Sequence, residues 1–215
     1  MIQRSAYQEH CHKWREGCGS ELCGKAHRVV LCRGSLPCAV LFVGEAPGES
    51  ENTLGSPFVG PAGQLLDVII KRGLPEGTRV AFTNLVGCIP YVEGYDFGKG
   101  RKAAEPPVEA IESCAPRLQE LVNMAAPKMV VCVGAMARDW LKPGYKNPVV
   151  IPKHVKIIDI THPAHILRGN VAARGFAVQR CEVAVRCAWE ELNEYVPPDE
   201  PLKTNLLGRD DEIPF

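Results

Sequence analysis

The sequence lacks any long apolar run. None of its apolar stretches approaches the roughly 20 residues that a membrane-spanning helix needs, and the polar N-terminus MIQRSAYQEH lacks the apolar centre of a secretory signal. A net charge is absent too, because 25 Lys and Arg balance 25 Asp and Glu, so overall charge indicates no polyanionic partner. We therefore expect a soluble, cytoplasmic protein.

The composition excludes the disordered, collagen-like and coiled-coil classes. Of the 215 residues, 46% are hydrophobic and 23% are charged, as in an ordinary packed domain. A single core suffices at this length, so we expect one domain over residues 1–195. Residues 196–215 are predicted to form a disordered acidic tail.

Short apolar runs alternate with helical patterns along the chain. Buried strands are predicted at Ala39–Val43, Val80–Thr83, Met129–Val133 and Val155–Ile160. Apolar residues at three- and four-residue spacing predict helices around Leu65–Ile70 with an end at Gly73, over Val108–Ala125, and over about Phe176–Glu194. Such alternation implies parallel pairing through right-handed crossovers. The predicted fold is α/β, a three-layer α/β/α arrangement with a central four-stranded, mainly parallel, twisted sheet.

Ligands of such folds bind beyond the carboxyl ends of the strands. The residues at these positions are Gly44–Gly48, Asn84, Gly134 and Thr161–Pro163. The first group continues as GEAPGESENTLGSPFVGPAGQLLD, in which glycines and prolines specify a shaped loop. The second strand leads into TNLVGC and the fourth into THPAHILR. We expect the functional site where these segments meet.

Together these motifs closely resemble family 4 uracil-DNA glycosylases, the iron-sulfur-containing branch. That family's pattern is G-E-x-P-G-x-x-E-x-x-x-G-x-P-F-V-G-x-A-G, then T-N-x-V-x-C, then H-P, and the likeness spans roughly residues 18–190. The first motif is specific because many fixed positions recur at fixed spacing. T-N and H-P gain value from their order and from falling at predicted strand ends.

The resemblance implies a pocket that receives a uracil flipped out of the DNA stack. Asn84 would pair with O4 and N3–H of uracil and reject cytosine. Phe58 would stack on the base, and His162 would place an N–H against O2, where negative charge accumulates. Each residue also has an ordinary structural interpretation: Asn84 as a turn cap, Phe58 as core, and His162 as a structural histidine.

Four further pocket positions follow from the first motif. Glu45 would hold water or support the cationic sugar, and Gly44 would border the substrate. Ala46 stands where single-domain uracil glycosylases carry a water-handling aspartate, and its methyl group cannot activate water. Gly48 stands where those relatives place a bulky aromatic that excludes thymine. Uracil is therefore the default substrate, with a modified pyrimidine as an alternative.

The 10 cysteines are too many for a cytosolic enzyme without a use for some of them, and too few for a disulfide scaffold. The resemblance implies a 4Fe-4S cluster on Cys18, Cys23, Cys88 and Cys114. Cys11 is a reserve ligand, with Cys32 or Cys38 weaker candidates. Zinc on the same thiolates or free thiols are the alternatives. Cys132, Cys181 and Cys187 are predicted to be ordinary buried cysteines.

DNA contacts are expected beyond His162. The resemblance places His165 and Arg168 at the minor groove, with Arg168 on phosphate and Ile166 or Leu167 as a wedge in the vacated stack. Residues 91–102, inside a predicted loop over 89–106, mix aromatics with cations and are a second candidate for DNA contact; a surface insertion is the alternative.

The C-terminal GRDDEIPF resembles the acidic tip of bacterial single-stranded DNA-binding proteins. The resemblance implies that the tail binds the repair and replication proteins that receive that tip, through Asp210, Asp211, Glu212, Ile213, Pro214 and Phe215. A solubilising acidic tail is the alternative.

The predicted function is that of a monofunctional glycosylase, without an evident lyase lysine, that removes uracil from single- or double-stranded DNA and initiates base excision repair. We expect a monomer. A noncatalytic iron-sulfur DNA-binding or adaptor protein is the competing class.

Overall fold

The structure is a computed structural model that describes residues 2–23, 26, 28–90, 104–142 and 148–194. The predicted DNA-contacting loop over 91–102 and the predicted tail over 196–215 therefore lie outside the described residues. Within the described ranges no helix is long and apolar enough to cross a membrane.

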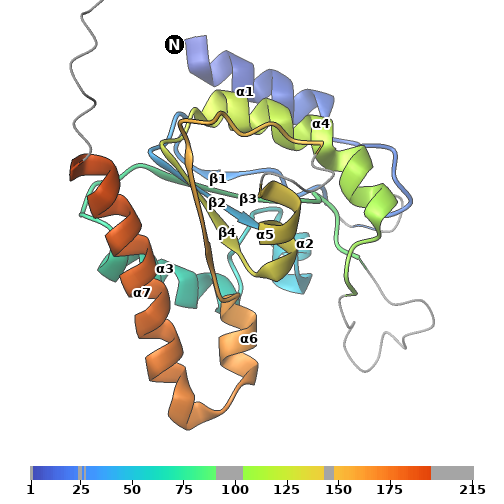
Figure 1. The fold of residues 1–215 in the computed structure, drawn as a ribbon. Coiled ribbons are helices and arrows are strands. Elements are labelled where there is room, and N and C mark those ends of the chain that lie inside the picture. Colours follow the sequence, from blue (N-terminus) through green and yellow to red (C-terminus); the bar gives the residue numbers. More distant parts are fainter. Residues whose placement is uncertain (1, 24–25, 27, 91–103, 143–147, 195–215) are drawn as a thin grey trace, which may run out of the picture.

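A sheet of five strands forms the centre of the fold, in the order β1-β3-β2-β4-β5 (Figure 1). The strands are β1 (Arg33–Gly34), β2 (Val40–Gly44), β3 (Val80–Asn84), β4 (Met129–Val133) and β5 (Lys156–Ile160). Strands β2 to β5 pair in parallel, and β1 pairs antiparallel with β3. The prediction of four strands is therefore wrong by one edge strand. With two residues, β1 is too short to leave an apolar pattern.

Helices α1 (Ile2–Lys13), α2 (Glu49–Leu54), α3 (Pro61–Gly73), α4 (Val108–Ala125), α5 (Ala135–Leu141), α6 (Pro163–Arg168) and α7 (Val171–Glu194) surround the sheet. The helix ending at Gly73 and the helix over Val108–Ala125 are confirmed. The last helix begins at Val171, five residues earlier than the predicted start.

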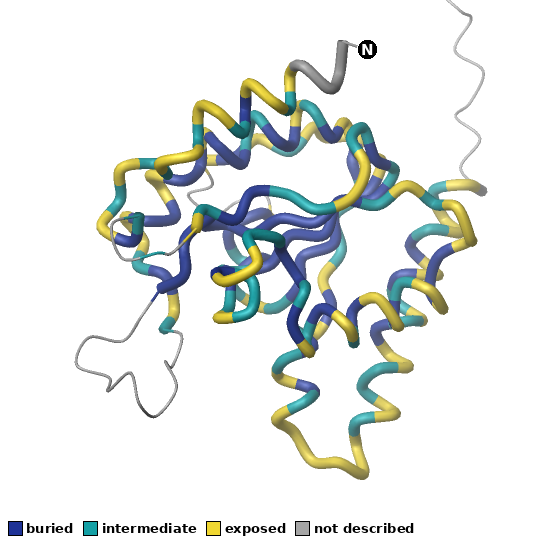
Figure 2. Tube along the Cα trace, turned by 180° about the vertical axis from the view of Figure 1, so that it is seen from behind, coloured by how far each residue is buried: buried dark blue, intermediate teal, exposed yellow. Residues whose placement is uncertain are grey.

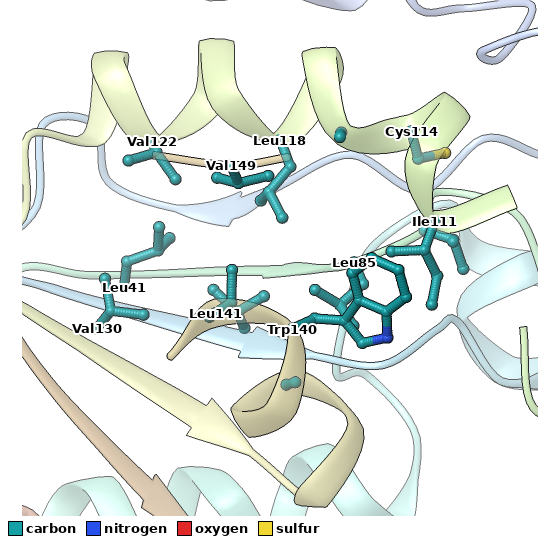
Figure 3. Packing of buried hydrophobic residues seen from close by; sticks show 14 of the residues in the cluster. Leu41, Leu85, Ile111, Cys114, Leu118, Val122, Val130, Trp140, Leu141 and Val149 are labelled. Atoms are coloured by element: carbon teal, nitrogen blue, oxygen red, sulfur yellow. The ribbon is translucent and has the colours of Figure 1, made fainter. Parts of the chain in front are cut away.

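The alternation of strand side chains divides the core into two layers. Leu41 and Val43 of β2 lie in the cluster that packs against α4 and α5, part of which Figure 3 shows. Val40 and Phe42 lie in the other cluster, against α3 and α7. Both faces of the sheet are thus covered, as uninterrupted apolar strands require, and the three-layer α/β/α prediction is confirmed.

Parallel pairing brings the carboxyl ends of the central strands to one edge. Gly44 at the end of β2 pairs with Asn84 at the end of β3, and Val133 of β4 pairs with Ile160 of β5. The chain leaves this edge through the α2 and α6 segments. The connection between α6 and α7 lies at the exposed end of the molecule, whereas the central strands β2 and β4 are buried (Figure 2).

Candidate active site

An open cavity of about 700 Å³ lies at this edge of the sheet. Its walls come from the segments that follow β2, β3 and β5. The predicted pocket residues among those lining it are Glu45, Ala46, Gly48, Phe58, Asn84, His162, His165 and Arg168. Residues far apart in the sequence are therefore brought together as the motifs predicted.

Gly44 supports the cavity without lining it. A Cβ atom at this position would lie 2.4 Å from Asn84 Oδ1 and 2.6 Å from Phe58 Cζ. Only a residue without a side chain lets the end of β2 approach these two groups so closely. Gly44 thus sets the distance between the ring and the amide.

Phe58 belongs both to the core and to the cavity. Its side chain is 6% exposed and packs on Phe82, with ring centroids 6.0 Å apart. Its other neighbour is the His162 ring at 6.5 Å, inclined by 29°. The backbone has a φ of 55°, a left-handed conformation that is uncommon for a bulky residue. The two interpretations of this residue as core and as stacking platform are therefore compatible.

Glu51 holds the loop that carries Phe58. Its carboxylate accepts hydrogen bonds from the backbone N–H groups of Gly48 at 3.1 Å, Val59 at 3.0 Å and Gly60 at 2.8 Å. These bonds join the start of α2 to the start of α3. The sequence analysis assigned no role to Glu51, although it occupies the second Glu of the first motif. That position was the signal that would have found it.

Asn84 presents a free amide to the cavity. It is 3% exposed, and its side chain makes no hydrogen bond to any residue in the part of the chain that the structure describes. Buried amides normally have hydrogen-bond partners, so the unpaired Asn84 amide is available to a ligand in the cavity. The turn-cap interpretation is not supported, because no such hydrogen bond forms.

His162 is held as a neutral imidazole of one tautomer. Its Nδ1 accepts a hydrogen bond from the N–H of Ala164 at 3.1 Å, at the N-terminus of α6. An accepting Nδ1 leaves the ring proton on Nε2. Burial lowers the pKa of His162, and the charge of Arg168 lowers it further. The ring therefore offers an N–H donor without a positive charge.

Glu45 is a half-buried carboxyl group at the end of β2. Burial raises its pKa, the nearby Glu105 raises it further, and Arg168 opposes both effects. Thr161, one of the residues expected after the fourth strand, also lines the cavity, as do Glu105, Arg138 and Asp159. No pattern in the sequence distinguishes these last three residues.

The α6 segment combines an exposed cationic face with a buried apolar one. His165 and Arg168 are exposed at the cavity. Ile166 is only 4% exposed and packs against the core under α7. The prediction of Ile166 as a DNA wedge is therefore wrong, since the amphipathic turn of α6 directs it inward; Leu167 is partly exposed.

Four thiols gather where the N-terminal segment meets β3 and α4. The sulfur atoms of Cys114 and Cys18 lie 3.0 Å apart, those of Cys18 and Cys23 3.8 Å, and those of Cys23 and Cys88 3.6 Å. These are the four predicted ligands. Among the described residues no group of three or more His, Cys, Asp or Glu has the arrangement of a site for a metal ion. The donor set is nonetheless that of thiolate-bound iron-sulfur clusters.

The pKa values of these thiols are shifted in different directions by their surroundings. A hydrogen bond from Cys18 lowers the pKa of Cys114 to about 7, and Arg117 adds to this effect. Burial raises the pKa of Cys88 to about 12. The reserve ligand Cys11 takes no part in the three sulfur contacts.

The N-terminal segment is anchored independently of the thiols. Glu120 on α4 accepts hydrogen bonds from Trp14 at 2.7 Å, from Lys13, and contacts His10 at 3.1 Å. These contacts hold α1 against α4 and so place Cys18 beside Cys114.

The remaining cysteines follow the prediction with one exception. Cys132 and Cys181 are buried, as expected of ordinary core thiols. Cys187 is exposed, so its predicted burial is wrong; it lies on the outer face of α7.

Comparison with known proteins agrees with this geometry. Residues 33–186 match the family described as the Uracil DNA glycosylase superfamily, and the chain belongs to it. Type-4 uracil-DNA glycosylases of Thermotoga maritima and Archaeoglobus fulgidus are both 30% identical, over 150 and 149 residues. These alignments cover 66% and 62% of this chain, and 73% and 69% of the relatives. The type-4 enzyme of Sulfurisphaera tokodaii is 38% identical over 103 residues, 47% of this chain and 42% of the relative. Within the superfamily, the chain is a member of the type-4 group.

Proposed function

We propose that this chain removes uracil from DNA by hydrolysing its N-glycosidic bond, which leaves an abasic site for base excision repair. The observation that supports the proposal most is the convergence of Phe58, Asn84 and His162 on one cavity, in a chain of the type-4 family. A base flipped out of the stack would be held between a ring, an amide and a neutral imidazole.

The geometry suggests how the bond breaks. The C1′–N1 bond would cleave with its electron pair on the base, and a water oxygen would then bond to the cationic C1′. The water would release its proton to the Glu45 carboxylate or to solvent, and the uracil anion would take up a proton from solvent. Asn84 would fix the base through O4 and N3–H. The Nε2–H of His162 would donate a hydrogen bond to O2 and so stabilise the negative charge that develops there. Because the imidazole is uncharged, it would do so without transferring its proton to the base. Glu45, if ionised, would orient the water or stabilise the cationic sugar.

The cofactor proposal is a 4Fe-4S cluster on Cys18, Cys23, Cys88 and Cys114. The support is a donor set of four thiols that are joined by three sulfur contacts and come from three segments far apart in the sequence. Such a cluster would connect the N-terminal segment to β3 and α4 and stabilise the packing of these three elements. Iron and acid-labile sulfide analysis, with zinc measured in parallel, tests this: four irons per chain are expected, and one zinc per chain would contradict it.

DNA would lie across the α6 end of the cavity. The segment from Thr161 to Cys181 carries three arginines and no acidic residue. Arg168 and His165 lie at the cavity rim, where a phosphate would pass beside a flipped nucleotide. Arg174 instead donates to the carbonyl of Leu167 and holds the connection between α6 and α7.

Oligonucleotides carrying uracil, hydroxymethyluracil or thymine, treated with alkali after incubation, test the function. Strand breaks at uracil are expected. Asn84→Ala should abolish them, while the matched control Asn193→Ala, which alters an exposed amide on α7, should not. Breaks with none of the three bases would favour the adaptor function, and breaks at hydroxymethyluracil alone would favour a modified pyrimidine.

The proposed tail partners and the proposed monomeric state need separate tests. Residues 210–215 lie outside the described residues, so the proposal rests on their sequence alone. A pull-down with and without the last six residues should lose repair proteins in the shorter chain, and equal recovery would contradict the proposal. Light scattering of the full chain should give one monomer mass.

A further inference from the structure

Arg117 of α4 is the largest fully buried side chain, 1% exposed. Its Nη2 donates to the carbonyl oxygens of Asn84 at 2.6 Å and Leu85 at 3.1 Å, and its Nη1 donates to Thr83 Oγ1 at 3.3 Å. The Thr83 hydroxyl in turn donates to the carbonyl of Leu31 at 2.7 Å. The guanidinium therefore binds the backbone at the end of β3, at Asn84, whose side-chain amide faces the cavity.

The positive charge of Arg117 has no carboxylate to balance it in the described part of the chain. None of the ion pairs formed there involves Arg117, and its Nε, also buried, has no hydrogen-bond partner. Burial of an unpaired cation is strongly unfavourable. A core position of this kind is normally apolar, so the retained charge requires a compensating anion nearby.

Thiolates at Cys114 and Cys88, two of the four proposed ligands, would supply such an anion. Cys114 precedes Arg117 by three residues on α4, so the two side chains share one face of the helix. On the opposite side, a Cβ atom at Gly87 would lie 3.6 Å from Arg117 Nε, and Gly87 is bonded directly to Cys88.

We infer that Arg117 is a positioning residue that couples the thiol group of Cys18, Cys23, Cys88 and Cys114 to the base-binding pocket. Its charge balances the thiolates, while its N–H groups fix the backbone at Asn84 and hence the direction of the Asn84 amide. The inference rests on the proposed function and on the proposed thiolate-bound cofactor. The cofactor would then influence the base-binding pocket through Arg117, without itself contacting the substrate.

Two substitutions separate the charge from the hydrogen bonds. Arg117→Lys keeps the cation but cannot reach three acceptors with one planar group. It should retain iron within twofold of wild type and lower kcat/KM on uracil DNA by roughly tenfold, the loss expected for hydrogen bonds from a charged donor. Arg117→Met removes both, and should lower the iron content severalfold as well. Arg186→Met, on an exposed position of α7, is the matched control and should change neither.

A stability measurement excludes a merely structural role. Thermal unfolding of the full chain is measured with iron bound and after its removal. For Arg117→Met, the stabilisation on iron loading should fall to less than half of the wild-type value, because the buried cation no longer faces the thiolates. Equal losses with and without iron would overturn the charge-balance argument, and unchanged kcat/KM in both variants would overturn the link to Asn84.

Failure of the proposed function is distinguishable from failure of this inference. Iron content and the stabilisation on loading are read without any substrate. A wild-type chain that binds iron but leaves uracil DNA intact would refute the glycosylase activity alone, and a wild-type chain that binds no metal would overturn the inference.

Discussion

Replacing Glu51 should disable the pocket without touching the base. Glu51→Ala leaves three backbone N–H groups, those of Gly48, Val59 and Gly60, without their acceptor. At roughly 1.5 kcal/mol for each hydrogen bond to a charged group, the loss in unfolding free energy is about 4.5 kcal/mol. For a chain of this length that corresponds to a fall in Tm of roughly 10 °C.

The kinetic consequence follows from the loop that these bonds shape. Phe58 is held at positive φ between the two ends of the loop, and release of the loop would allow its ring to leave the cavity. We expect kcat/KM to fall by roughly five- to 150-fold, since one stacking contact is worth about 1–3 kcal/mol. Glu51→Gln keeps one acceptor oxygen and should lie between Glu51→Ala and wild type in both measurements.

Urea unfolding and steady-state cleavage of a uracil oligonucleotide are the assays, with Glu76→Ala, an exposed glutamate after α3, as the control. If Glu51→Ala and Glu76→Ala unfold within about 0.5 kcal/mol of each other, the range for neutral surface changes, the assigned role of Glu51 is refuted.

Three further predictions follow. Burial lowers the pKa of His162 below 6.5, so below pH 6.5 the unfolded chain binds more protons at this group than the folded chain. The contribution of His162 to stability therefore falls as the pH falls in this interval. The decrease of kcat at acid pH that is due to His162 should lie below pH 6.5 and be absent in His162→Gln. Gly44→Ala would place a Cβ 2.4 Å from Asn84 Oδ1 and should cost about 1–3 kcal/mol in unfolding free energy and most of the activity, whereas Gly175→Ala, with open space around it on α7, should stabilise the helix by up to about 1 kcal/mol. Arg168→Ala should weaken DNA binding for all sequences and reduce the salt dependence of log Kd by about one, as measured by fluorescence anisotropy, while Arg186→Ala should leave both unchanged.

The sequence was sufficient for the parallel part of the fold because strands buried on both faces are continuous apolar runs. Val40–Gly44 and Met129–Val133 are entirely buried, and their patterns are unambiguous. The edge strand Arg33–Gly34 pairs with β3 and with no other strand of the sheet, and no local sequence pattern predicts so short an element. Helix α1 was missed for a different reason: its stability comes from the contacts of Trp14 and its neighbours with Glu120, more than 100 residues away.

The site was predictable where chemistry demands a residue type and unpredictable where geometry alone does. Asn84, Phe58 and His162 must have particular donors or rings, so their motifs are informative. No sequence motif requires an arginine at position 117, because the proposed role of Arg117 depends on α4 passing over the end of β3. Polar residues stand close to Arg117 on both sides in the sequence, so no local pattern predicts that this cation is buried.

The spacing of the first two thiols shows how local backbone conformation replaces a sequence rule. Cys18 and Cys23 have four residues between them, where the family usually has two. Gly17 adopts a φ of 87°, and a Cβ atom there would lie 2.3 Å from Cys23 Sγ, so only glycine lets the turn fold back on the second thiol. The N–H of Cys18 donates to Cys23 Sγ at 3.3 Å, and Ser20 Oγ lies 3.6 Å from the same sulfur. The turn between Cys18 and Cys23 is therefore compact, and it places the sulfur of Cys18 beside that of Cys114 and the sulfur of Cys23 beside that of Cys88, as the proposed set of four ligands requires.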